Sequence, residues 1–342
     1  MEKRYFLTRH SIKPKGEDVE SEEYKGISKK GVELARNSAK NILDDIERTP
    51  KGAVIFLGGA SDEIRTRSTA EVYGDELKRL LADKEDYMVI TRGDITKGKG
   101  YSAMAKQVKE MVDANPDKRI IVDIPMFMKE FSLKRKGWLT KEGKPAPYLT
   151  KLIERHKGNE YEAMKDWLTT QGKEGELRGP APEDIAKSYE KGINRLEKFA
   201  KRYIGDRPYV TGLVGHSFEA DAYLTYLAGD GKVDLSTFEK VSSGKGMIKE
   251  TEMASVRVTP EITTITYRGA EHHKRKGLEN IAGALAIMGV LGGIFFLSPN
   301  LTGNAIADLT NKTTSFVGAG LLIVGLVGAF FYFKNRNIVK RK

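Results

Sequence analysis

YFLTRH, residues 5–10, is a short apolar run that leads directly into an arginine and a histidine. The same arrangement returns at YVTGLVGH, residues 209–216, where a second apolar run ends at a histidine. Further runs of this kind lie at 53–57, 87–91 and 119–124. Most of them are continuously apolar rather than alternating, which is typical of strands buried on both faces of a sheet.

Helical patterns separate these strands. They cover residues 28–46, 65–81, 102–114 and 182–203. Strands that alternate with helices indicate a parallel sheet with helices on both sides. We therefore expect an α/β fold with three layers, α/β/α, and a mainly parallel sheet within a catalytic domain of residues 1–271.

Two segments depart from this alternation. Residues 129–182 are rich in lysine and glycine, with weak helices at 147–155 and 161–170, and we interpret them as an insertion that caps the crevice. Residues 255–258 and 262–267 alternate in polarity around Pro260, which predicts a closing hairpin.

The composition limits the chemistry. With 342 residues, 31% charged and 39% hydrophobic, the chain is globular, and the absence of cysteine excludes disulfides, thiolate metal sites and a cysteine nucleophile. The net charge is +11, but residues 274–342 hold nine basic and two acidic residues, which leaves +4 for residues 1–273. Nucleic acid is therefore not an expected partner of the folded domain.

The carboxyl-terminal part predicts a membrane anchor. Residues 281–297 and 315–333 contain no charged residue, and each run is close to the roughly 20 residues that cross a bilayer. A buried core hairpin is the alternative, although soluble helices are seldom apolar on every face. We expect two transmembrane helices within 281–333, between a basic linker, 272–280, and a basic tail, 334–342.

The flanking charges predict the orientation of this anchor. Because positive residues stay on the cytoplasmic side, both termini and the catalytic domain are expected in the cytoplasm, with lipid as a partner. The start of the chain lacks an apolar signal core. Gly289 and Gly293 have a GxxxG spacing that would allow two copies of the chain to form a homodimer through these helices.

Strand ends and one helix start bring together a set of basic and imidazole side chains: Arg9, His10, Arg65 and His216. The carboxyl ends of strands in an open α/β sheet are where ligands usually bind. Guanidinium groups bind phosphate oxygens bidentately, and a neutral imidazole can attack phosphorus. This combination predicts phosphoryl transfer through a phosphohistidine, without a metal or a cofactor, because the arginines supply the positive charge.

These motifs resemble those of the histidine phosphatase superfamily, also called phosphoglycerate-mutase-like. Its strand followed by Arg-His-Gly is similar to residues 7–11, and its LSxxGxxQA pattern is similar to residues 27–35. Its SSPxxRxxxTA segment is similar to residues 60–71, and its late Gly-His pair to residues 215–216. The resemblance covers roughly residues 4–267, with the four motifs in the family's order.

The resemblance implies roles for individual residues. His10 would be the nucleophile, Arg9 and Arg65 would bind the phosphate, and His216 would donate a further hydrogen bond to the transferring group. The chain departs from the family at Ser11, where glycine is usual, and at Gly58-Gly59-Ala60, which precede Ser61 in place of the family's serine pair.

The general acid has no clear counterpart in the sequence. Glu130 is the first candidate because it follows the strand at 119–124, and Asp123 and Glu63 are the alternatives. The family branch that uses an aspartate directly after the second histidine is disfavoured, since Ser217 stands there.

The expected activity is that of a membrane-anchored phosphatase that hydrolyses a phosphomonoester of a small molecule or a protein. Two other functions stay open at this point. One is a phosphoglycerate-mutase-like phosphotransferase, and the other is a catalytically inactive, membrane-tethered phosphate-binding protein.

Overall fold

The computed structural model describes residues 2–95, 100–124 and 128–275. Almost all of the described residues belong to one compact unit, which comprises residues up to Thr259 and Thr263–Lys274. Within the described residues, no helix is both long enough and apolar enough to cross a bilayer. The spans expected at 281–297 and 315–333, the Gly289 and Gly293 pair and the tail 334–342 lie outside the described residues.

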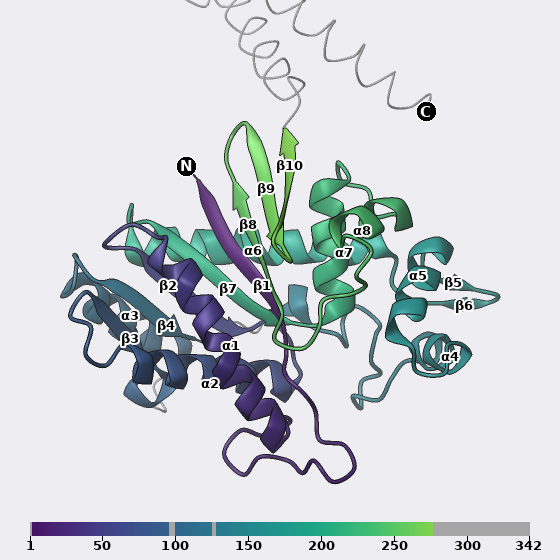
Figure 1. The fold of residues 1–342 in the computed structure, drawn as a ribbon, viewed down its shortest axis with the longest axis horizontal. Helices are drawn as coiled ribbons and strands as arrows, with labels where there is room; N and C mark the ends of the chain where they lie inside the picture. Colours follow the sequence, from purple (N-terminus) through teal and green to yellow (C-terminus); the bar gives the residue numbers. More distant parts are fainter. Residues whose placement is uncertain (1, 96–99, 125–127, 276–342) are drawn as a thin grey trace, which may run out of the picture. The chain divides into compact units, whose positions relative to one another are not determined.

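The compact unit is built on one large sheet. Its strands are β1 (Lys3–Arg9), β2 (Val54–Gly59), β3 (Tyr87–Ile90), β4 (Arg119–Asp123), β7 (Tyr209–Gly215), β8 (Met253–Val258), β9 (Ile262–Tyr267) and β10 (Ala270–Arg275). Their order is β10-β9-β8-β1-β7-β2-β4-β3 (Figure 1). The neighbours from β1 to β3 pair in parallel, whereas β8 pairs antiparallel with both β1 and β9.

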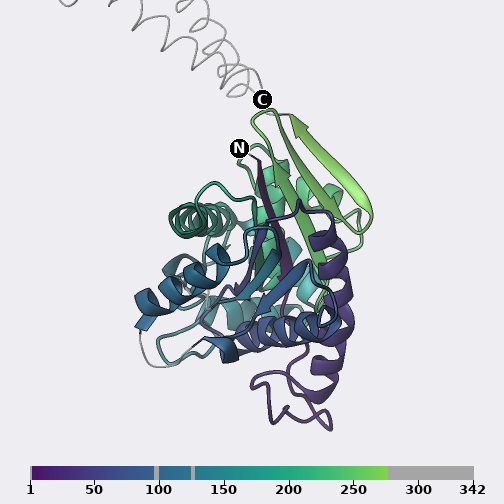
Figure 2. The same ribbon diagram turned by 90° about the vertical axis from the view of Figure 1, so that its left-hand side faces the viewer.

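Helices cover both faces of the sheet. They are α1 (Lys29–Glu47), α2 (Ile64–Leu80), α3 (Gly100–Asp113), α6 (Pro182–Ile204) and α7 (Ser217–Ala228). In Figure 1, α1 lies in front of the sheet and α6 behind it, and Figure 2 shows the layers from the side.

The burial of alternate strand residues explains this layering. Phe6 packs among residues of α1 and α2, whereas its neighbours Tyr5 and Leu7 pack on the opposite side among residues of α6 and α7. Every other side chain of a strand points to the same face. The continuously apolar strands are thus buried on both sides, which confirms the α/β class and the mainly parallel sheet.

The helix starts follow local chemistry. Ser28 precedes α1, and its hydroxyl accepts a hydrogen bond from the Gly31 amide at 3.0 Å, as a serine does at an N-cap. Pro182 opens α6, where a proline removes no intrahelical hydrogen bond.

The closing hairpin is longer than predicted. It is present as β8 and β9, but β10 follows it and contains residues 272–275, which were expected to begin a basic linker. The alternation in this last strand is hidden in the sequence because five of its six residues are charged or histidine.

The remaining elements lie outside the main layers. Residues 129–182 contain η2 (Lys129–Phe131), α4 (Pro147–Arg155), α5 (Glu160–Thr170) and the two-stranded sheet of β5 (Lys173–Glu174) and β6 (Leu177–Arg178). Both predicted helices of this segment are present. The short elements η1 (Arg92–Asp94) and α8 (Leu235–Val241) complete the described part.

Candidate active site

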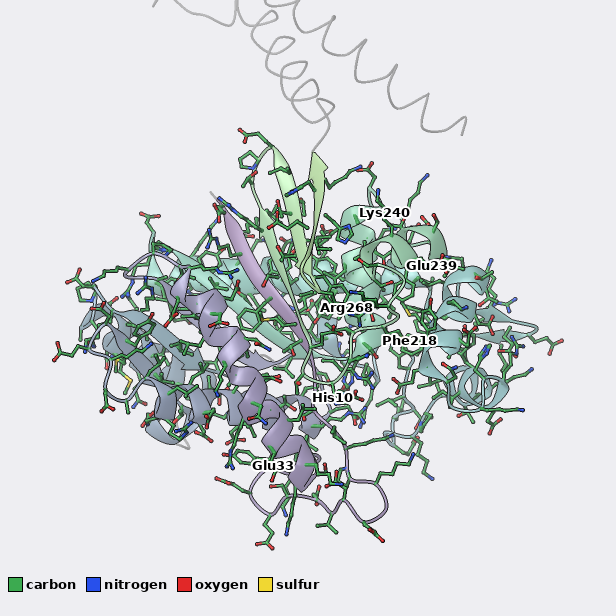
Figure 3. All side chains as sticks on the ribbon, viewed as in Figure 1. His10, Glu33, Phe218, Glu239, Lys240 and Arg268 are labelled. Atoms are coloured by element: carbon green, nitrogen blue, oxygen red, sulfur yellow. The ribbon has the colours of Figure 1, made fainter. Side chains whose placement is uncertain are left out.

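The site lies where β1, β7 and β2 end side by side. Arg9 is the register partner of Gly215, and Gly59 is the partner of Val214, so the residues that follow these strands meet at one edge. His10 follows β1, and His216 follows β7 as the N-cap of α7. Their ring centroids are 5.0 Å apart with an interplanar angle of 66°. Figure 3 places His10 near the end of β1.

The imidazole of His10 is buried and held in one orientation. Its Nδ1 lies 2.7 Å from the carbonyl oxygen of Ser11, and 6% of the residue is exposed. A carbonyl oxygen only accepts hydrogen bonds, so Nδ1 must carry the hydrogen. In the neutral ring this leaves the lone pair on Nε2, which is the atom that can attack an electrophile.

The surroundings keep this ring neutral. Burial is the largest influence and, together with the positive charge of Arg65 and then of Arg9, lowers the pKa of His10 to about 3. The hydrogen bond to Ser11 opposes this shift. His10 is therefore uncharged at physiological pH, the state that nucleophilic attack requires.

Ser11, which departs from the family pattern, fits the local structure. Its hydroxyl donates to the Gly31 carbonyl at 2.6 Å, and its amide donates to the Thr69 hydroxyl at 3.0 Å. The residue is fully buried and fastens the end of β1 to the helices α1 and α2. The Ser11 hydroxyl therefore connects the turn that carries His10 to α1.

His216 is connected to the third strand end. Its Nε2 lies 2.8 Å from the hydroxyl oxygen of Ser61, which also accepts a hydrogen bond from the Glu63 amide at 2.9 Å. Burial, followed by the proximity of His10 and Arg65, lowers the pKa of His216 well below its ordinary value. The serine of the third motif thus holds the second imidazole.

Arg65 lies in the first turn of α2 and reaches the same cavity. Its Nε atom is buried and finds no hydrogen-bond acceptor among the described residues, and the nearest carboxylate, on Glu63, is 3.9 Å from Nη2. A buried donor without a partner favours an anionic ligand at this position.

Gly59 allows α2 to begin this close to the sheet. A Cβ atom at Gly59 would lie 2.6 Å from the Arg67 amide nitrogen. Only glycine permits so close an approach of the strand end to the helix. Gly59 therefore allows the first turn of α2, which carries Arg65, to pack closely against the end of β2.

Arg9 forms ion pairs with two carboxylates. Its Nη2 lies 2.9 Å from Glu160 of α5 and 2.9 Å from Glu250. Its Nε, like that of Arg65, is buried without an acceptor in the described part of the chain. An incoming phosphate would therefore compete with these two carboxylates for the guanidinium group.

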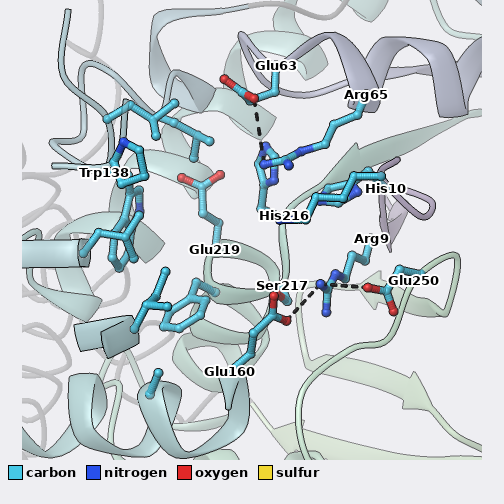
Figure 4. Close-up of a pocket in the computed structure, with 18 of the residues that line it drawn as sticks. Arg9, His10, Glu63, Arg65, Trp138, Glu160, His216, Ser217, Glu219 and Glu250 are labelled. Atoms are coloured by element: carbon cyan, nitrogen blue, oxygen red, sulfur yellow. Dashed lines mark ion pairs between the residues drawn. The ribbon is translucent and has the colours of Figure 1, made fainter. Parts of the chain in front are cut away.

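These side chains open into a cavity of about 640 Å³ (Figure 4). At one end it is lined by the reactive and charged residues Arg9, His10, Lys13, Glu63, Arg65 and His216. The rest of the wall comes largely from residues 133–163, which supports the expectation that the inserted segment caps the crevice. The volume falls within the usual range for small-molecule sites, roughly 300–1,000 Å³.

The structure does not bring Glu130 to this cavity. Its carboxylate lies 2.8 and 3.0 Å from Nη1 of Arg195 on α6, and the residue is not among those that line the cavity. Asp123, at the end of β4, is also outside the cavity. Its carboxylate lies 3.0 Å from Nε of Arg92. Of the three acids that the sequence suggested, Glu63 alone lines the cavity.

Glu219, which the sequence interpretation missed, is a further acid in the cavity wall. It lies in the first turn of α7, and one carboxylate oxygen is 2.8 Å from Nζ of Lys136. The other oxygen is buried and has no donor among the described residues. Burial raises the pKa of Glu219, although the nearby Lys136 opposes the shift.

A signal for Glu219 exists in the sequence, three residues after His216. A residue at this spacing shares the first turn of a helix that begins at the strand end, so it lies beside the residues that follow the strand. Figure 4 shows its carboxylate between His216 and Trp138.

Among the described residues there is no group of three or more histidine, aspartate or glutamate side chains that could hold a metal ion.

Comparisons with known proteins give resemblances in structure only. No family model matches the sequence, and no curated protein matches it. Solved structures that resemble the chain include mycobacterial hydrolase 2, with 13% identity and a TM-score of 0.38 over 81% of this chain and 90% of that one.

Two further resemblances are to enzymes of phosphate chemistry. Mycobacterial glucosyl-3-phosphoglycerate phosphatase has 12% identity and a TM-score of 0.37, over 75% of this chain and 91% of that one. A phosphoglycerate mutase from Bacillus anthracis has 10% identity and a TM-score of 0.35, over 80% and 92% of the two chains. All three TM-scores are below 0.5, and the interpretation of the site depends on the residues of this chain.

Proposed function

We propose that the chain is a phosphomonoesterase that works through a phosphohistidine on His10. One observation carries this proposal: a buried, neutral imidazole keeps a free Nε2 at a strand end, 5.0 Å between centroids from a second imidazole. Arg65 lies beside both rings, with a buried donor that has no protein acceptor in the described chain.

The first step forms the phosphoenzyme. Nε2 of His10 attacks phosphorus in line, the bond between phosphorus and the ester oxygen breaks, and the oxygen leaves as an alcohol after it takes a proton from a nearby acid. The guanidinium of Arg65 and an N–H of His216 stabilise the charge on the phosphoryl oxygens. Arg9 joins them once the phosphate displaces the carboxylate of Glu160, whose side chain is 54% exposed and can move aside.

The second step releases phosphate. Water attacks phosphorus, the bond from Nε2 breaks, and the acid of the first step takes a proton from the water. We propose Glu219 for this proton transfer, because it lines the cavity and its raised pKa favours the protonated form. Glu63 lines the same end of the cavity and is the alternative.

The carboxyl-terminal sequence adds a location to this proposal. The uncharged runs at 281–297 and 315–333, with basic residues before and after them, support a two-helix membrane anchor that keeps the catalytic domain and both termini in the cytoplasm. Lipid would then surround the anchor, and the spacing of Gly289 and Gly293 supports close packing of two such helices.

The direct test uses the full-length chain with p-nitrophenyl phosphate. We expect release of p-nitrophenol and, after rapid acid-free quenching with a ³²P-labelled ester, label on His10. His10→Asn should lose both. The control is His273→Asn, which removes a 52% exposed histidine of β10 and should keep both. Equal turnover by the His10→Asn chain would exclude the phosphohistidine.

A further inference from the structure

The wall of the cavity that faces the reactive end is apolar. Six side chains from the inserted segment form it: Leu133, Trp138, Leu139, Pro145, Leu149 and Ile153. Phe218, next to the catalytic end of α7, continues this surface toward the histidines. The cavity therefore joins a charged end to an apolar chamber.

Helix α4 has one face in the protein core and another at the cavity. Tyr148 and Leu152 of this helix are buried in the core, whereas Leu149 and Ile153, also four residues apart, line the cavity. Residues four apart share one helix face. Ile153 is 39% exposed, which is unusual for an isoleucine in the described part of the chain and leaves apolar surface for a ligand to cover.

Trp138 adds one polar group to this chamber. Its ring packs against Trp167 at 5.1 Å and Phe218 at 5.5 Å between centroids. Its Nε1 is buried and has no acceptor among the described residues, and Figure 4 shows the side chain at the side of the cavity opposite Arg65. A buried indole N–H usually has a partner, so a ligand oxygen at this depth would satisfy it.

Hydroxyl-rich ligands would find few partners on this wall. The polar side chains that the inserted segment contributes, besides the indole of Trp138, are Asn159 and Glu160. Asn159 already accepts two amide hydrogen bonds at the start of α5, so Glu160, once phosphate displaces it from Arg9, is the one carboxylate that the described residues of this segment offer to hydroxyl groups. A sugar bound here would leave hydroxyl groups without partners, which is unfavourable.

We infer that the substrate is an amphiphilic phosphomonoester, whose phosphate lies between His10 and Arg65 and whose leaving alcohol carries a hydrocarbon group that fills the chamber beside α4. This inference rests on the proposed phosphatase function. It specifies the leaving alcohol of the substrate, which the histidines and arginines of the site do not determine.

The test is a homologous series of ethyl, butyl and hexyl phosphate, with the full-length chain in lipid nanodiscs. Each methylene that enters the chamber should raise kcat/KM about fourfold, because burial of a CH₂ is worth about 0.8 kcal/mol and 1.36 kcal/mol is a factor of ten. From ethyl to hexyl this amounts to about 200-fold. Glucose 6-phosphate should be a poorer substrate than hexyl phosphate. A flat series, or a preference for glucose 6-phosphate, would overturn the inference.

Two variants test whether Leu149 and Ile153 cause the increase of kcat/KM with alkyl chain length. Leu149→Gln with Ile153→Gln should reduce the ratio of kcat/KM for hexyl phosphate to that for ethyl phosphate at least tenfold. The matched control is Val19→Gln, which also replaces an exposed apolar side chain, 52% exposed, but one that does not line the cavity. It should keep the parent ratio. If the double substitution leaves this ratio unchanged, the hydrocarbon group of the substrate does not bind beside α4.

Binding to the His10→Asn chain separates this inference from the phosphatase proposal. Calorimetry should show tighter binding of hexyl phosphate than of ethyl phosphate by a comparable factor. If the parent chain hydrolyses no ester but this preference persists, the amphiphile site stands and the phosphatase proposal fails. If every ester is hydrolysed with the same kcat/KM, hydrolysis stands and the amphiphile site fails.

Discussion

Replacement of His10 by asparagine should make the protein less sensitive to acid. The folded chain keeps this imidazole neutral, with a pKa of about 3, whereas an unfolded histidine titrates near 6.5. Between these two values the unfolded chain binds more protons than the folded chain. The free energy of unfolding therefore rises with pH in this window and falls as the pH drops below 6.5.

The two pKa values give the size of the effect. At pH 7.4 both states of His10 are essentially neutral, so its contribution is close to zero. At pH 5 most unfolded chains carry the proton and almost no folded chains do. The linkage relation then gives a loss of about 2 kcal/mol in unfolding free energy from His10 alone. His216, whose pKa is also lowered, adds a loss of the same sign that the substitution leaves in place.

The measurement is urea unfolding at pH 7.4 and pH 5.0 with the full-length chain in lipid vesicles. Trp138 and Trp167, the two tryptophans of the chain, are both buried in the unit that carries the site, so their fluorescence reports the unfolding of that unit. The difference in unfolding free energy between the two pH values should be about 2 kcal/mol smaller for His10→Asn than for the parent.

Thr8→Val is the matched control, since it changes a buried, non-titrating side chain of β1 and should shift stability equally at both pH values. A difference between pH 7.4 and 5.0 that is the same in His10→Asn and the parent would refute the claim that the fold holds this ring neutral. The nucleophile would then have to be activated by a neighbouring base.

Three further substitutions test other parts of the site. Glu160→Gln removes a carboxylate that competes with phosphate for Arg9, so KM for phosphate esters should fall several-fold in steady-state assays, and a rise in KM would argue against this competition. Glu219→Gln should lower kcat/KM, which reports the step that expels the alcohol, by about 10²–10⁴-fold for alkyl phosphates, the usual contribution of a general acid. The kcat/KM for p-nitrophenyl phosphate should fall much less, because p-nitrophenolate leaves without a proton. Equal losses of kcat/KM for both esters would point to another acid. Gly59→Ala places a Cβ 2.6 Å from the Arg67 amide and should lower the free energy of unfolding by about 1–3 kcal/mol in urea titrations, whereas an unchanged value would mean that α2 shifts freely.

Much of the fold follows from the sequence because the strands are buried on both faces. The runs at 5–8, 53–57 and 209–214 have no polar alternation, and they occupy β1, β2 and β7 in the middle of the sheet. The edge is harder to predict: β10 carries the sequence AEHHKR, whose charges indicate a linker rather than a strand. Its pairing with the hairpin depends on contacts that no local pattern reveals.

The site was predictable where backbone topology places the residues. His10 and His216 meet because both follow neighbouring parallel strands, and a strand end fixes the position of the next residue closely. The acid was not predictable in this way. Glu130 comes seven residues after the end of β4, and its carboxylate pairs with Arg195 from a helix far along the chain. Glu219 has a local signal, its spacing of three residues from His216, but its ion pair with Lys136 of the inserted segment has no counterpart in any local pattern.

The division of labour in the cavity has a consequence for how such a protein can diversify. The reacting groups come from strand ends distributed across more than 200 residues, whereas the apolar wall comes largely from one contiguous stretch, 133–163. Changes to the apolar residues of that single stretch can redirect the chain toward a different alcohol and leave the phosphorus chemistry in place, as long as Lys136 and Glu160, which pair with Glu219 and Arg9, are kept. Substitutions that change the preferred alcohol can therefore accumulate separately from those that change the reacting groups.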